Sequence, residues 1–177
     1  ASYKAGKYDL AHKYLNTLEN QYKNYPYFFE LSGDIYYKNG SFEKAIDEYK
    51  KAIKAIDEQF IPSTDLIKFS LVKSYLQTSK KKYLNDSIIV LEQLIQNNPK
   101  WSYLWRLLAK SSNKVNRIGI SYIALAEEAL INGLIKYDKN QGWRGVVGNL
   151  NETDLEFENV IKKTKKLDLI SDKNKSK

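Results

Sequence analysis

The chain has 177 residues, 42% of them hydrophobic, which is enough for one core or a short helical repeat array. It contains no cysteine, which excludes disulfide bonds and thiolate metal sites, and no apolar run reaches the roughly 18 residues of a membrane span. The net charge is +8, but +5 of it lies in residues 162–177, so the rest of the chain gives no argument for nucleic-acid binding.

The sequence repeats itself at a spacing of 34 residues. The aligned pairs include Tyr3 with Tyr37, Gly6 with Gly40, Tyr8 with Phe42, and Ala11 with Ala45. This is the period of the tetratricopeptide (TPR) repeat, a pair of antiparallel helices that buries its apolar face only by stacking on the next pair. It predicts an all-α, TPR-like α-solenoid and a role in recognition rather than catalysis.

Hydrophobic spacing and helix-end residues predict seven helices over residues 1–133. The expected helices cover about 7–24 (the second helix of a truncated repeat), 26–39, 41–57, 64–78, 83–97, 100–113 and 118–132. In the clearest pair, Gly33 predicts a close approach of two helices, with Tyr36 filling the space beside it. Asn39-Gly40 ends the first helix of that pair and Ser41 caps the second.

The composition of the sequence changes at Gly133, where glycines become frequent. Residues 134–152 are expected to form a Gly-rich loop or short strands. Thr153-x-x-Glu156 is a capping box that predicts a short helix over 153–167. Residues 168–177 are expected to be a basic, disordered tail, because the lysines there lack the interleaved aromatics or arginine that nucleic-acid contacts use.

Residues 3–133 resemble the C-terminal TPR region of bacterial periplasmic zinc metalloproteases of the outer-membrane assembly-enhancing type. The matching segments are Pro-Tyr-Phe-Phe-Glu-Leu-Ser-Gly-Asp-Ile-Tyr at 26–36, Trp-Arg-Leu-Leu-Ala at 105–109 and Ala-Leu-Ala-Glu-Glu-Ala-Leu-Ile-Asn-Gly at 124–133. The resemblance implies a periplasmic location and a role in outer-membrane protein assembly and quality control. The start, Ala-Ser-Tyr-Lys-Ala-Gly-Lys, has neither Met nor an apolar leader, so we expect it to be an internal cut. The resemblance implies that a catalytic domain precedes it.

A second, shorter stretch, about residues 128–165, resembles a non-catalytic segment of class A penicillin-binding proteins. It carries Ala-Leu-Ile-Asn-Gly-Leu-Ile-Lys-Tyr-Asp followed by Gly-Trp-Arg-Gly. The alternative hypothesis is therefore a fragment related to peptidoglycan synthesis, or a fusion of the two families with its seam near 126–133.

No complete set of catalytic motifs of either family is present in the sequence. The only histidine is His12, so the His-Glu-x-x-His zinc motif is missing, and His12 is expected to be a surface or groove residue of a helix. Ser-x-x-Lys recurs by chance in this lysine-rich chain, without the Lys-Thr-Gly strand of a transpeptidase. Glu127 and Glu128 are expected to be helix-dipole partners or solvated carboxylates. We therefore expect a non-enzyme that needs no cofactor or metal.

The first helix of each TPR pair lines the concave groove, so its exposed face is the candidate binding site. Tyrosines there offer a large contact area and a hydroxyl, and the lysines and arginine can hold carboxylates. The Lys/Asn set of carboxylate-clamp TPRs is not reproduced. The predicted groove residues are Tyr27, Glu30, Asp34, Tyr37, Lys38, Phe69, Lys73, Gln77, Tyr103, Arg106, Lys110 and Asn113.

These features predict a non-catalytic scaffold that binds a protein or peptide in the groove, or packs on a preceding protease domain. Nucleic acid is not an expected partner.

Overall fold

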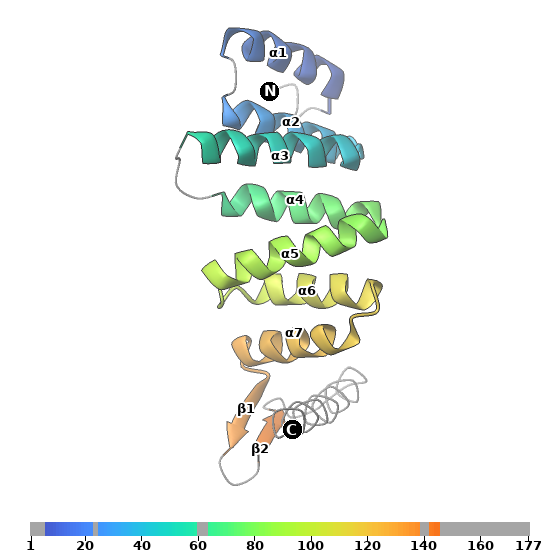
Figure 1. The fold of residues 1–177 in the computed structure, drawn as a ribbon, viewed down its shortest axis with the longest axis vertical. Helices are drawn as coiled ribbons and strands as arrows, with labels where there is room; N and C mark the ends of the chain where they lie inside the picture. The colour runs from blue at the N-terminus through green and yellow to red at the C-terminus, as the bar shows by residue number, and fades with distance from the viewer. Residues whose placement is uncertain (1–5, 23–24, 60–63, 139–141, 146–177) are drawn as a thin grey trace, which may run out of the picture. The chain divides into compact units, whose positions relative to one another are not determined.

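The computed structural model describes residues 6–22, 25–59, 64–138 and 142–145, which form seven α-helices and one two-stranded hairpin (Figure 1). The helices lie where the hydrophobic spacing predicts them, so the all-α, TPR-like prediction is confirmed. The predicted helix 153–167 and the tail 168–177 lie outside the described residues. The elements are α1 (Tyr8–Gln21), α2 (Pro26–Lys38), α3 (Phe42–Glu58), α4 (Asp65–Thr78), α5 (Lys81–Asn97), α6 (Ser102–Lys114), α7 (Ile118–Ile131), β1 (Ile135–Asp138) and β2 (Gly142–Gly145).

The chain divides into two compact units, residues 1–90 and 91–177, and the division falls inside α5. In unit 1, α1 packs on α2, α2 on α3, and α3 on α4. The pair α2–α3 is joined by a three-residue turn, so its helices run antiparallel (Figure 1). In unit 2, α6 packs on α7, and α7 contacts β1.

The α2–α3 contact depends on Gly33 and Tyr49. Tyr49 is 1% exposed, and a Cβ atom placed on Gly33 would lie 2.7 Å from Cε1 of the Tyr49 ring. The predicted close approach at Gly33 is therefore confirmed. The prediction that Tyr36 fills the space beside it is wrong, because α3 turns Tyr49 toward Gly33, and Tyr36 instead packs against the His12 ring of α1.

This contact makes a substitution at Gly33 informative. Gly33→Ala is expected to lower the free energy of unfolding by about 1 to 2 kcal/mol, because overpacking by the new methyl outweighs the better helix propensity of Ala. Urea unfolding followed by circular dichroism measures the change. In a Tyr49→Leu background the same substitution should cost little. An equal cost in both backgrounds would mean that the Tyr49 ring is not the obstacle.

Left-handed residues end three helices by the same hydrogen-bond pattern. Gly40 has φ +75°, and the Ser41 N–H donates to the Tyr36 carbonyl, as in a Schellman motif. Asn116 and Gly133 hold the corresponding positions after α6 and α7. The Ser41 prediction is only half right, since Ser41 is the N-cap residue of α3 but its side chain makes no capping hydrogen bond.

The described residues of unit 2 end in a short antiparallel hairpin. Ile135 pairs with Gly145, and Asp138 pairs with Gly142, so β1 and β2 occupy part of the predicted Gly-rich segment. Ile135 is buried and Leu134 is exposed. The hairpin begins at Ile135, immediately after the Gly133 turn that ends α7.

Candidate ligand-binding face

Three of the predicted groove residues meet where α2 and α4 lie together. The Lys73 ammonium is 5.7 Å from the centroid of the Tyr37 ring and 5.0 Å from that of the Phe69 ring. All three side chains are partly exposed, and no acidic side chain of the described residues forms an ion pair with Lys73. A cation over two aromatic rings is held in place by the ring quadrupoles and stays available to an anion.

Glu30 and Asp34 lie one turn apart on α2, and both are partly buried. The Tyr49 hydroxyl donates a hydrogen bond of 2.6 Å to Oδ1 of Asp34, so Asp34 is tied to the α2–α3 contact. Burial, and then the nearby Asp34 carboxylate, raise the pKa of Glu30 above its ordinary value. Asp34 thus supports the fold and also lies beside the candidate face.

The remaining predicted groove residues of unit 1 lie further from Lys73 along the two helices. Tyr27 is exposed at the start of α2, where its ring lies 5.4 Å from that of Tyr25. Lys38 and Gln77 are exposed at the ends of α2 and α4. Gln77 also lines a shallow hollow of about 460 Å³, shared with the turn between α2 and α3.

Leu66 lies on the same face but is not among the groove residues predicted from the sequence. It is 70% exposed, the most exposed large hydrophobic side chain among the described residues. The spacing to Phe69 and Lys73 is three and seven residues, which puts all three on one side of α4. That spacing was readable from the sequence, where Leu66 is easily taken for a core residue because apolar residues surround it. We call the set Tyr37, Leu66, Phe69 and Lys73 the α2–α4 face.

The predicted groove residues of unit 2 lie on α6. Tyr103, Lys110 and Asn113 are exposed, as the prediction requires. Arg106 is different, because its Nε donates to Oε1 of Glu128 on α7 at 2.6 Å, and its Nη2 lies 2.5 Å from the same oxygen. The hydrogen bond to Glu128 raises the pKa of Arg106 further above its ordinary value. Arg106 therefore fastens α6 to α7, which leaves it less free to hold a ligand.

The prediction for Glu128 is wrong. Glu127 and Glu128 lie near the C-terminal end of α7, where a carboxylate opposes the helix dipole. Glu128 is neither solvated nor a dipole partner. It is 7% exposed and paired with Arg106, so its role is structural.

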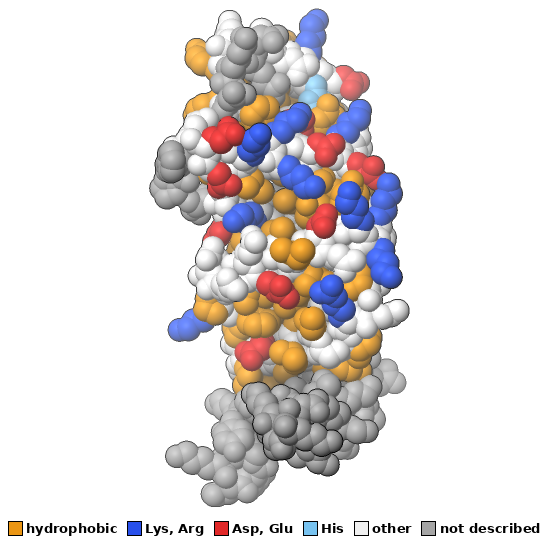
Figure 2. All heavy atoms as spheres, in the orientation of Figure 1, with side chains coloured by type: hydrophobic (Ala, Val, Ile, Leu, Met, Phe, Trp, Pro, Cys, Tyr) orange, Lys and Arg blue, Asp and Glu red, His pale blue; other side chains and the backbone are white. Residues whose placement is uncertain are grey.

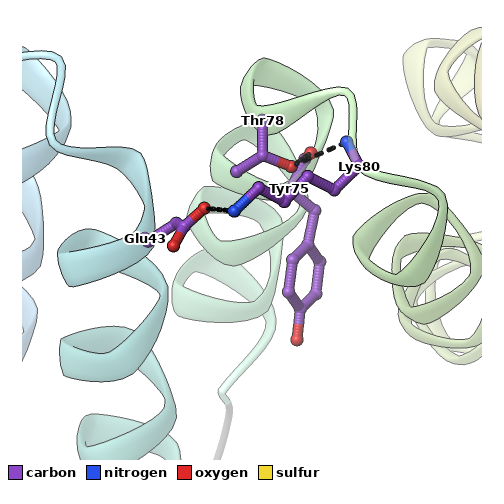
Figure 3. A network of polar contacts seen from close by, with 4 residues as sticks. All are labelled: Glu43, Tyr75, Thr78 and Lys80. Atoms are coloured by element: carbon purple, nitrogen blue, oxygen red, sulfur yellow. Dashed lines mark hydrogen bonds and ion pairs between the residues drawn. The ribbon is translucent and has the colours of Figure 1, made fainter.

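A polar network joins the start of α3 to the end of α4 in unit 1 (Figure 3). The Lys80 ammonium pairs with the Glu43 carboxylate, and the Thr78 hydroxyl donates to the Tyr75 carbonyl at 2.8 Å. The Lys80 backbone N–H donates to the Thr78 hydroxyl at 3.4 Å. These contacts orient the residues that follow α4 and occupy Lys80, so Lys80 is not available as a binding cation.

The charged surface of unit 1 carries both signs. On the face drawn in Figure 2, basic and acidic side chains of unit 1 are interleaved, with apolar side chains between them. Within the residues that the structure describes, no group of three or more His, Cys, Asp or Glu side chains is placed to hold a metal ion. In the same residues, no helix combines the length and apolar character needed to cross a bilayer.

Comparisons with known proteins agree with this fold. Residues 2–73 match the family model of a tetratricopeptide repeat-like domain. The structures of MamA from Desulfovibrio magneticus RS-1 (residues 41 to the end) and of a MamA RS-1 double mutant align with a TM-score of 0.64 each, at 17% and 16% identity. Both alignments cover 75% of this chain and 70% of the other. The fold is TPR-like. No curated protein matches the sequence.

The comparisons do not extend to the two enzyme families that parts of the sequence resemble. They support a TPR-like helical domain, the fold of many non-catalytic scaffolds, and give no support to a metalloprotease or a penicillin-binding protein.

Proposed function

We propose that this chain is a non-catalytic scaffold that binds a protein or peptide through the α2–α4 face of unit 1. The observation that carries the proposal is the Lys73 ammonium, which lies over the Tyr37 and Phe69 rings and has no ionic partner among the described residues. A TPR-like fold presents the first helices of its pairs to ligands, and α2 and α4 are such helices.

The chemistry of this face selects its ligand. Lys73 offers a positive charge that is partly shielded from water, so a carboxylate placed beside it gains more than it would at an open surface. Leu66 and Phe69 supply apolar area next to that charge, and the Tyr37 ring supplies an amphipathic edge. The best-fitting ligand is a peptide segment with an acidic side chain beside an apolar one.

A capture experiment with a matched control tests this. Immobilised wild type, Lys73→Ala and Lys54→Ala would be incubated with a periplasmic extract, and bound proteins quantified by mass spectrometry. Lys54 is a suitable control because it is an exposed lysine of α3 that, within the described part of the chain, forms an ion pair only with Glu58. Lys73→Ala is expected to lose at least about tenfold in capture of specific partners, as for a central interface charge, and Lys54→Ala to lose none.

Circular dichroism must first show that the three proteins are equally helical. Capture by wild type should also fall with added salt, because a lysine–carboxylate contact at a partly exposed site is screened. Equal capture by wild type and Lys73→Ala would contradict the α2–α4 face as the binding site.

We further propose the setting in which the scaffold acts: the accessory region of a periplasmic zinc metalloprotease in outer-membrane protein assembly. This rests on the resemblance of segments 26–36, 105–109 and 124–133 alone. The endogenous protein, isolated from cells with an antibody against this chain, should contain zinc and show peptidase activity that a chelator removes. Isolation from the cytoplasmic fraction, or without zinc, would contradict this setting and leave the α2–α4 face untouched.

A further inference from the structure

The attachment of α1 to the rest of unit 1 is narrow. Among the described residues, its buried core is made of Ala11 and Leu15 of α1 against Ile35 of α2, with Tyr8 and Phe28 packed beside them. Along another side of α1, Leu10, Tyr14 and Leu18 remain 39%, 59% and 41% exposed. A helix with so few buried apolar side chains is among the least stable parts of a structure, and such parts open locally while the rest stays folded.

The only histidine of the chain lies in this attachment. The His12 ring centroid lies 4.1 Å from that of Tyr36 on α2, with 36° between the ring planes. Nε2 of His12 is buried and has no hydrogen-bond partner among the residues that the structure describes. Protonation would place a charge on this ring and a buried N–H that donates to nothing, which is costly in a protein interior.

The charged groups around His12 do not compensate for the unfavourable effect of burying the protonated ring. Glu48 on α3 and Asp9 on α1 favour the protonated ring, and Lys44 on α3 disfavours it. The Lys44 ammonium also lies 5.5 Å from the Tyr36 ring centroid, on the same aromatic side chain that His12 contacts. Burial outweighs the two carboxylates, and the pKa of His12 lies below its ordinary value of 6.5.

We propose that α1 is held on α2 by a pH-sensitive contact: protonation of His12 weakens the contact, so α1 opens in mildly acidic solution while α2, α3 and α4 stay folded. The direction follows from proton linkage. When α1 is open, His12 has its ordinary pKa of 6.5 and binds a proton more readily than when α1 is closed. The stabilisation of α1 is therefore complete above about pH 6.5 and is lost as the pH falls from there through the lowered pKa of closed α1.

Because the chain has one histidine, the titration of one imidazole signal follows the protonation step of the proposed contact. In an NMR titration of the full chain, the midpoint of the His12 ring proton is expected below 6.5. Hydrogen exchange of peptides from residues 8–21, corrected for intrinsic rates, should show protection that falls between pH 7.5 and 5. The loss in protection approaches tenfold for each pH unit by which the midpoint lies below 6.5.

His12→Phe is the matched variant, since it keeps an aromatic ring against Tyr36 and cannot take up a proton. Its α1 protection should not change between the two pH values, and peptides from residues 42–58 should be unchanged in both proteins. A midpoint at or above 6.5 overturns the proposal, as does a lowered midpoint without loss of α1 protection. If α1 does not pack on α2 in His12→Phe, the NMR titration and the hydrogen exchange of the wild type still test the proposal.

Discussion

Replacing Tyr49 by Ala is expected to lower the free energy of unfolding by about 4 kcal/mol, the largest loss foreseen for a single change in unit 1. Tyr49 is 1% exposed, its ring lies against Gly33, and its hydroxyl donates to Asp34. Removing the side chain would leave a cavity where α2 and α3 approach most closely. Urea unfolding monitored by circular dichroism would show the loss as a lower midpoint.

Tyr49→Phe separates the ring from the hydroxyl. It keeps the packing on Gly33 and removes the 2.6 Å hydrogen bond to Asp34, so it should cost about 1 to 2 kcal/mol. If Phe cost as much as Ala, the stability at this position would come from the hydrogen bond to Asp34, and the ring contact with Gly33 would carry little.

The second large effect is expected in unit 2. Arg106→Ala should lower the free energy of unfolding by about 2 to 3 kcal/mol, because it leaves the Glu128 carboxylate buried without its partner. The value is below that of a fully buried pair, since the Arg106 side chain is 62% exposed and water shares its charge. Thermal unfolding at neutral pH measures the change.

Two variants test the cause of this loss. Lys110→Ala removes another exposed cation from α6, one that pairs with no acidic side chain among the described residues, and should change stability by less than about 0.5 kcal/mol. Adding Glu128→Gln to Arg106→Ala should recover part of the loss, because a neutral amide costs less to bury than an unpaired carboxylate. Similar losses for Arg106→Ala and Lys110→Ala would show that the Glu128 pair contributes nothing.

The helices of this chain were predictable mainly from the 3.6-residue period, which fixes which side of each helix is apolar. The 34-residue period relates α1 and α3, which begin at Tyr8 and Phe42, whereas the later helices follow their counterparts at longer spacings. The identity of the residue that packs on Gly33 was not predictable in the same way. Tyr36 is near Gly33 in sequence, but the contact belongs to Tyr49, and choosing it requires knowing how α3 is rotated and shifted against α2.

The candidate site was predictable to the extent that it follows helix position. Tyr37, Phe69 and Lys73 were assigned to one face by their places in the repeat, and the structure brings them together. Arg106 was assigned by the same rule, yet it is bound to Glu128, 22 residues further along the chain. A repeat period describes the backbone and the apolar positions and carries no information about which charged side chains pair.

The neighbour-to-neighbour packing of unit 1 has a consequence for how the chain folds. Each helix from α1 to α4 packs mainly on the one that precedes or follows it, so most tertiary contacts join residues that are close in sequence. Forming them requires closing only short loops, which costs little chain entropy. Unit 1 should therefore fold within microseconds to milliseconds, as low-contact-order helical proteins do, with the α2–α3 hairpin as the natural starting point.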